Sequence, residues 1–151
     1  MNELKAKAYE IGISKVKEKM QMFREERNAI NQGILEDNKS SAGDKFETGR
    51  ETMTQDLNTV EKQLKQANFE FDELCRLQSI KGISPTIQEG SLVKIGNDLF
   101  LISISLGQIN VGDEKVFLLS ENSPLGQSLI GKKENEEIQF RGKLMKILEI
   151  S

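Results

Sequence analysis

Residues 36–47 read EDNKSSAGDKFE, a polar segment that separates two long runs with matching apolar spacing. In each run, apolar side chains recur at alternating steps of three and four residues, which is the a/d spacing of a coiled coil. The only polar positions on these two seams are Arg27 and Arg50. The seam residues are Ala6, Tyr9, Ile13, Val16, Met20, Phe23, Arg27, Ile30 and Ile34 before the segment, and Arg50, Met53, Leu57, Val60, Leu64, Ala67, Phe71 and Leu74 after it.

The two seams mirror each other about Ala42. Pairing them outward from that residue places Phe23 opposite Val60, and the same register holds along both runs. A constant register of this kind predicts two antiparallel helices that form a coiled-coil hairpin. Gly43 lies at the expected tip, where glycine supplies the backbone freedom that a chain reversal needs.

The expected tip carries two carboxylates, Asp44 and Glu47, at the start of the second helix. Residues three apart near a helix start lie on one face, so both carboxylates can address one ion. The same residues also suit a local role, because Asp44 is a good N-cap and Glu47 completes a variant of the capping box. Basic residues nearby, Lys39, Lys45 and Arg50, fit either contact with a partner or pairing within the helices.

The second helix is followed by a change of domain. Gly82 and Pro85 are helix-ending residues and predict a linker over 82–87. We therefore predict a helical hairpin over 1–81 and a β-rich domain over 88–151.

The β-rich domain is predicted from short apolar runs between glycine-containing turns. The expected strands are 92–95, 99–105, 116–119, 137–141 and 144–150. Between the third and fourth of these, Ser123 and Pro124 open a short helix as N-cap and first helical residue, and Gly131 closes it. The domain is therefore expected to be a small antiparallel sheet with one helix, which makes the chain α+β.

The composition excludes several classes of protein. The chain has 151 residues with 21 basic and 24 acidic side chains, and its formal net charge of −3 gives no basic field for duplex nucleic acid. It has no His and one Cys, Cys75, which excludes an internal disulfide, a Cys/His zinc finger and nucleophile–histidine catalysis. No apolar run approaches the ~20 residues that span a bilayer, and the charged start does not resemble a signal peptide, so we expect a cytoplasmic protein.

Two short segments carry more specific information. Residues 121–132 read ENSPLGQSLIGK, and residues 43–47 read GDKFE. The first is similar to the C-terminal signature of the Gre family of bacterial transcript-cleavage factors, in which Ser-Pro opens a helix and Leu-Ile-Gly-Lys closes it. The second resembles the Gly-Asp-x-x-Glu tip that this family carries on an antiparallel coiled coil. Because the order of the domains also agrees, the resemblance covers nearly the whole chain.

The resemblance implies a partner and an activity. Family members bind RNA polymerase, with an FK506-binding-protein-like C-terminal domain at the mouth of the secondary channel and the coiled coil threaded through it. The acidic pair, Asp44 and Glu47 here, is then implied to share a Mg²⁺ with the polymerase active site and to help cleave backtracked RNA near its 3′ end. The chain itself would be a monomer without a stably bound cofactor, and not an enzyme, because it acts in trans.

The same resemblance suggests where the chain contacts the polymerase. Within the C-terminal signature, the candidate contact residues are Ser123, Pro124 and Lys132. No membrane partner is implied, and the nascent RNA is met only indirectly.

Other functions remain open at this point. After Glu47 the chain reads Thr48-Gly49-Arg50-Glu51, where the family usually has Asn-Ala-Glu-Tyr, so one alternative is a channel-binding regulator without cleavage activity. A structural coiled-coil adaptor is another alternative, and it would self-associate through an exposed seam. A peptidyl-prolyl isomerase rests on fold analogy alone, and the scattered aromatics of 88–151 do not favour an aromatic pocket. These aromatics are Phe100, Phe117 and Phe140.

Overall fold

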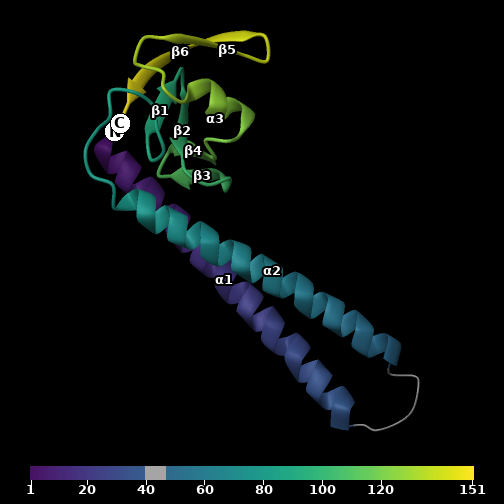
Figure 1. Cartoon of the computed structure of the whole chain (residues 1–151). Coiled ribbons are helices and arrows are strands. Elements are labelled where there is room, and N and C mark those ends of the chain that lie inside the picture. Colours follow the sequence, from purple (N-terminus) through teal and green to yellow (C-terminus); the bar gives the residue numbers. More distant parts are fainter. Residues whose placement is uncertain (40–46) are drawn as a thin grey trace. The chain divides into compact units, whose positions relative to one another are not determined.

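A computed structural model of the chain describes residues 1–39 and 47–151 (Figure 1). The side chains at 37–39, 47, 48 and 50 lie outside this description. Backbone contacts divide the chain into two compact units, one formed by Met1–Ser14 with Asp72–Ser151 and the other by Lys15–Phe71. The start of the first helix and the end of the second therefore belong to the same unit as the sheet.

Two long helices form the N-terminal part of the chain, α1 at Asn2–Lys39 and α2 at Glu47–Gln78. Both helices lie within the predicted helical region 1–81, and α2 ends three residues before its boundary. At the end of α2, the Ser79 hydroxyl donates a hydrogen bond to the Arg76 carbonyl oxygen at 2.6 Å, which satisfies one of the free carbonyls of the last turn. In the described part of the chain, no helix is both long and apolar enough to cross a membrane.

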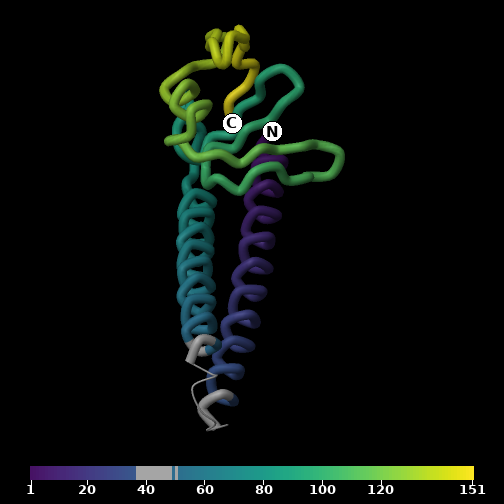
Figure 2. The backbone as a smooth tube through the Cα atoms, turned by 90° about the vertical axis from the view of Figure 1, so that its right-hand side faces the viewer, coloured from purple at the N-terminus to yellow at the C-terminus, as the bar shows by residue number. Residues whose placement is uncertain are grey.

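Within residues 15–71, α1 and α2 lie side by side (Figure 2). They run in opposite directions. Lys19 in the middle of α1 bonds Glu70 near the end of α2, whereas Gly33, further along α1, faces Met53 early in α2. The side chains buried in this unit are Val16, Met20, Phe23, Val60, Leu64 and Ala67. Nearer to residues 39 and 47, the seam side chains are only half-buried: Ile30, Ile34, Met53 and Leu57.

The expected seam is wrong at its first position. Ala6 is exposed, whereas Ala8 is fully buried. The next residue, Tyr9, is buried as well, and its hydroxyl donates a hydrogen bond to the Gly90 carbonyl oxygen at 3.2 Å. The buried side of α1 therefore includes residues that meet the segment before the sheet, which the spacing of two helices alone does not reveal.

The C-terminal part carries a six-stranded sheet with the order β3-β4-β2-β1-β6-β5. Its strands are β1 at Leu92–Ile95, β2 at Asp98–Ile102, β3 at Gly107–Val111, β4 at Glu114–Leu119, β5 at Glu137–Phe140 and β6 at Lys143–Ile150. A short helix, α3 at Pro124–Leu129, follows β4 in the chain (Figure 1). The fold is therefore α+β, as predicted, with a long helical region followed by a sheet and a short helix.

The sheet is mixed, so the prediction of an antiparallel sheet is wrong. β2 and β4 pair in parallel, with Leu99 opposite Val116, while the other neighbouring strands are antiparallel. The cause is β3 at Gly107–Val111, which is not among the predicted strands. After β2 the chain forms β3 at the edge of the sheet and turns back at Gly112, so that β4 returns beside β2 in the same direction.

An apolar core joins α3 to the sheet. Its buried members are Ile87, Val93, Ile95, Ile102, Leu129, Ile138, Ile147 and Ile150. Burying each such side chain contributes about 1.5–3 kcal/mol relative to leaving it exposed. Because Leu129 in α3 belongs to this core, the helix and the loop before it are held firmly against the sheet.

Candidate functional site

The predicted acidic pair lies at the edge of the described chain. α2 begins at Glu47, but the side chain of that residue is not described, and Asp44 and Lys45 fall outside the described residues. The side chains of Lys39 and Arg50 are not described either. The role of this pair in sharing Mg²⁺ therefore stays a prediction.

Ser123, one of the predicted partner contacts, caps the start of α3. The Ser123 hydroxyl accepts a hydrogen bond from the Gly126 amide at 3.1 Å and donates one to the Ser120 carbonyl oxygen at 2.7 Å. Pro124 follows as the first helical residue, where its missing N–H costs nothing. Ser123 is thus the N-cap that the sequence indicated, and its hydroxyl is already engaged on both sides.

Gly126 is required by a close approach of two backbone segments. The residue is buried, and a Cβ placed on it would overlap the Ser120 carbonyl oxygen. Its own carbonyl oxygen accepts a hydrogen bond from the Ile130 amide at 3.0 Å. The Ser-Pro-x-Gly part of the signature-like segment therefore has a structural explanation that is independent of any partner.

Lys132 is placed by its backbone at the far end of the same segment. Its carbonyl oxygen accepts a hydrogen bond from the Ile87 amide at 2.8 Å, and the Gly131 amide donates to the Ile87 carbonyl oxygen at 2.8 Å. Its side chain is half-exposed and forms no ion pair with any other described residue. Of the three predicted contact residues, Pro124 is exposed, and Ser123 and Lys132 are half-buried.

A charged cluster that the sequence did not predict lies in the same unit, centred on Arg76 in the last turn of α2. The Arg76 guanidinium donates to both carboxylate oxygens of Glu73, at 2.8 and 3.2 Å, and to Glu89 at 3.0 Å. Glu89 lies in the segment before β1, so the ion pairs tie the end of α2 to that segment. The Arg76–Glu73 pair is readable from a spacing of three on a helix, whereas the proximity of Glu89 arises only from the fold.

The electrostatics of this cluster differ among its carboxyl groups. Hydrogen bonds from Arg76 lower the pKa of Glu73. The same bonds, with those to Glu89, raise the pKa of Arg76. Partial desolvation raises the pKa of Glu121, and the charge of Glu89 and a hydrogen bond with it act in the same direction. Glu121 therefore holds its proton more tightly than a free glutamate.

Comparison with known proteins adds no family assignment. No protein-family model matches the chain, and no curated protein matches it. The resemblance described above thus rests on residues 43–47 and 121–132. Only the second of these segments lies wholly within the described residues.

The chemistry available in the described part of the chain is modest. Across residues 1–39 and 47–151, no three or more Asp, Glu or Cys side chains are arranged to hold a metal ion. In the cluster around Arg76, one guanidinium binds the carboxylates of Glu73 and Glu89. Ion pairs at exposed positions contribute little to stability, because solvent screens them. Cys75 is half-buried and forms no disulfide. We therefore assign the Arg76 cluster a structural role.

Proposed function

We propose that this chain is a transcript-cleavage factor of the Gre type, which binds RNA polymerase through its secondary channel and stimulates cleavage of backtracked nascent RNA. The observation that carries the proposal is the place of GDKFE, residues 43–47, which joins two long helices and overlaps the start of the second. In this proposal α1 and α2 form a coiled-coil hairpin with its tip near Ala42. The region 88–151 is an FK506-binding-protein-like domain, and the protein is a cytoplasmic monomer.

The proposed mechanism is the delivery of negative charge in trans. Asp44 and Glu47 would offer two carboxylates to a Mg²⁺ at the polymerase active site, a hard cation that prefers oxygen ligands such as carboxylates, waters and phosphate oxygens. A second metal ion stabilises the attacking and leaving oxygens of phosphoryl transfer. The polymerase supplies the remaining ligands and the cleavage chemistry, so this chain is an activator that binds no cofactor stably.

The helices support such delivery by their length and their buried seam. α1 has 38 residues. A helix of that size is about 57 Å long at ~1.5 Å per residue. Val16, Phe23 and Val60 are almost completely buried, and the pairing of long buried seams stiffens two helices against each other. In this proposal, an arm of this kind carries the acidic pair into the secondary channel.

The signature-like segment supports the docking half of the proposal. α3 is anchored by Ser123, Gly126 and Leu129, so its exposed residues are presented on a rigid element. Pro124 is exposed beside this anchor, and Lys132 offers an unpaired cation among the described residues. We propose both side chains as contacts to the polymerase.

A second candidate function is a channel-binding regulator that does not stimulate cleavage. It is favoured by Thr48-Gly49-Arg50-Glu51, which departs from the residues that usually follow the acidic pair in the Gre family. This candidate uses the same docking domain and the same arm. It differs only in what the tip does at the active site.

The test uses backtracked elongation complexes assembled with the polymerase of the same organism. The full chain is added, RNA release is followed on gels, and binding to the polymerase is measured in parallel. The proposal predicts shortened transcripts that can be extended again, with little effect on complexes that have not backtracked. Binding without cleavage would select the regulator, and the absence of binding would contradict both candidates.

A further inference from the structure

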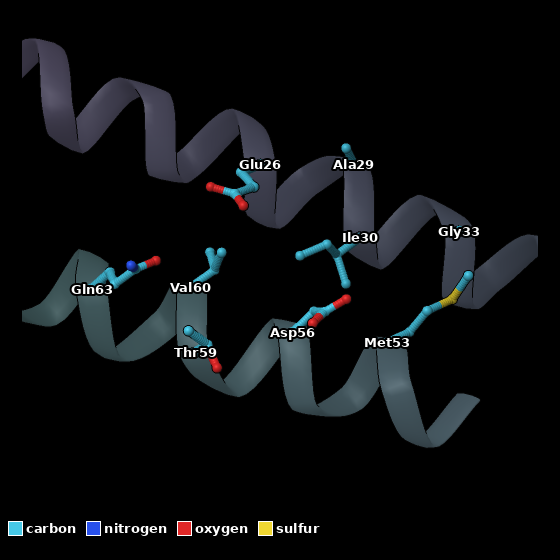
Figure 3. A pocket seen from close by; sticks show the side chains of 9 residues that line it. All are labelled: Glu26, Ala29, Ile30, Gly33, Met53, Asp56, Thr59, Val60 and Gln63. Carbon is cyan, nitrogen blue, oxygen red and sulfur yellow. The ribbon is translucent and has the colours of Figure 1, made fainter. Parts of the chain in front are cut away.

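A groove opens between α1 and α2 on one side of the unit formed by residues 15–71. It has a volume of about 640 Å³ and is lined from both helices (Figure 3). Its floor is apolar and includes Ile30, Met53 and Val60. This volume lies within the range of about 300–1,000 Å³ that is typical of ligand pockets, so the groove has room for several side chains.

Small or short residues from both helices contribute to the lining of the groove. Ala29 and Gly33 in α1 and Thr59 in α2 line the groove. A Cβ on Gly33 would lie 3.4 Å from the Met53 methyl, so Met53 packs directly against the glycine. Side chains of two helices that face each other normally interdigitate, and here they leave space.

The charges along the groove follow the register of the two helices. Lys19 and Glu70 form an ion pair across the helices with a nitrogen–oxygen distance of 3.1 Å. Moving one heptad along each helix from this pair brings Glu26 opposite Gln63. Both of these residues line the groove. One heptad beyond the ion pair, the Glu26 carboxylate therefore faces the uncharged Gln63 and not a cation.

The next heptad also places a carboxylate opposite an uncharged residue, but here the carboxylate lies on α2. It brings Asp56 of α2 opposite Gly33 of α1, and both residues again line the groove. Figure 3 shows the Glu26 and Asp56 side chains pointing from opposite helices toward the gap between them. Neither carboxylate forms an ion pair or hydrogen bond with another described residue, and no described residue that lines the groove is basic.

We propose that this groove docks a basic amphipathic helix of a partner protein. Two carboxylates on opposite walls, about 10 Å apart along the axes at ~1.5 Å per residue, match two Arg or Lys side chains roughly two helical turns apart. The apolar stems of those side chains, with an apolar residue between them, cover the floor formed by Ile30 and Val60. This is the helix-in-groove mode of recognition, with charge deciding which helices bind. The inference does not rest on the proposed function.

The test uses the full chain and a synthetic helical peptide that carries two Arg residues two turns apart beside an apolar stripe. A matched peptide has Gln in place of both Arg. Binding is measured by calorimetry at low and at high salt, and the Met53 methyl signal reports by NMR whether the peptide enters the groove. We expect the Arg peptide to bind at least tenfold more tightly, with the difference shrinking at high salt.

Variants of the chain locate the interaction. Glu26→Gln with Asp56→Asn should remove the preference for the Arg peptide, whereas Glu18→Gln with Glu61→Gln, which removes the same charge from exposed positions outside the groove, should retain it. Gln63→Lys should weaken binding of the Arg peptide, because the new lysine supplies a cation opposite Glu26.

Three outcomes would overturn the proposal. They are equal binding of the two peptides, a preference that survives the Glu26 and Asp56 changes, and self-association of the chain that depends on these two carboxylates. The last outcome, measured by sedimentation equilibrium, would assign the groove to a second copy of the chain.

Discussion

Replacing Ser123 with Ala should destabilise the unit that contains the sheet, because this hydroxyl makes two hydrogen bonds where α3 begins. It accepts from the Gly126 amide at 3.1 Å and donates to the Ser120 carbonyl oxygen at 2.7 Å. Losing an N-cap side chain costs about 0.5–2 kcal/mol. The Ser120 oxygen keeps its second bond, from the Ser123 amide, so it is not left unpaired. We therefore expect a loss of about 1.5 kcal/mol.

The assay can report on this unit alone. The chain has one Tyr and no Trp, and that residue, Tyr9, is buried in the same unit as α3. Urea unfolding followed by tyrosine fluorescence should show a midpoint lower by about 0.5–1.5 M, given a denaturant slope of about 1–3 kcal/mol per M. Ser123→Asn keeps an acceptor and should recover most of the loss.

A neighbouring serine provides the control. The Ser128 hydroxyl donates to the Pro124 carbonyl oxygen within α3, so Ser128→Ala removes a hydroxyl from the same helix without touching its cap. We expect this control to change stability by less than about 0.5 kcal/mol. An unchanged midpoint in Ser123→Ala would refute the capping role and return Ser123 to the list of residues explained only by a partner.

Three further changes test other parts of the structure. Gly126→Ala should cost about 3 kcal/mol, because its Cβ would overlap the Ser120 carbonyl oxygen, and a near-normal urea midpoint would contradict that contact. Phe23→Ala should cost about 3 kcal/mol, because the ring is 8% exposed, and an unchanged helical melting curve by circular dichroism would show that it is not part of a packed seam. Glu121→Gln should stabilise the chain at pH 7 and lose this effect below about pH 4. The reason is that a carboxyl group whose pKa is raised on folding destabilises the folded state once the pH is high enough to ionise it. A stabilisation that persists at low pH would exclude the raised pKa as its cause.

The sequence was most informative where the physical signal is local. The 3-4 spacing of Val16, Phe23 and Val60 identified the two long helices and the side chains that they bury. Ser123 and Pro124 identified the start of α3, because an N-cap followed by proline is a short-range signal that tertiary contacts rarely override.

The missed features all depend on contacts between distant parts of the chain. The strand β3 was not among the predicted strands, and only its pairing with β4 reveals it. Ala6 matched the helical spacing but is exposed, whereas Ala8, which lies off the predicted seam, is fully buried. The proximity of Glu89 to Arg76 has no sequence signal at all.

The same distinction between local signals and contacts of distant segments applies to the acidic pair and to the groove. The pair Asp44 and Glu47 was found from a local motif at a predicted helix start, and its proposed role lies in a complex with another protein. The groove was not predicted, although the heptad spacing places the residues that line it. Glu26 and Asp56 occupy flanking positions that could have held cations, and only the structure shows that an open groove lies between them.

Variants of the acidic pair should separate stimulation of cleavage from binding to the polymerase. Asp44→Asn keeps a competent N-cap, and Glu47→Gln keeps a capping-box partner, so both variants should fold normally while each loses one negative charge. Our account predicts that each variant binds the polymerase with unchanged affinity, loses most of its stimulation of cleavage on backtracked complexes, and regains part of it as Mg²⁺ is raised. Full stimulation by the double variant at limiting Mg²⁺ would contradict the account and leave capping as the role of the acidic pair.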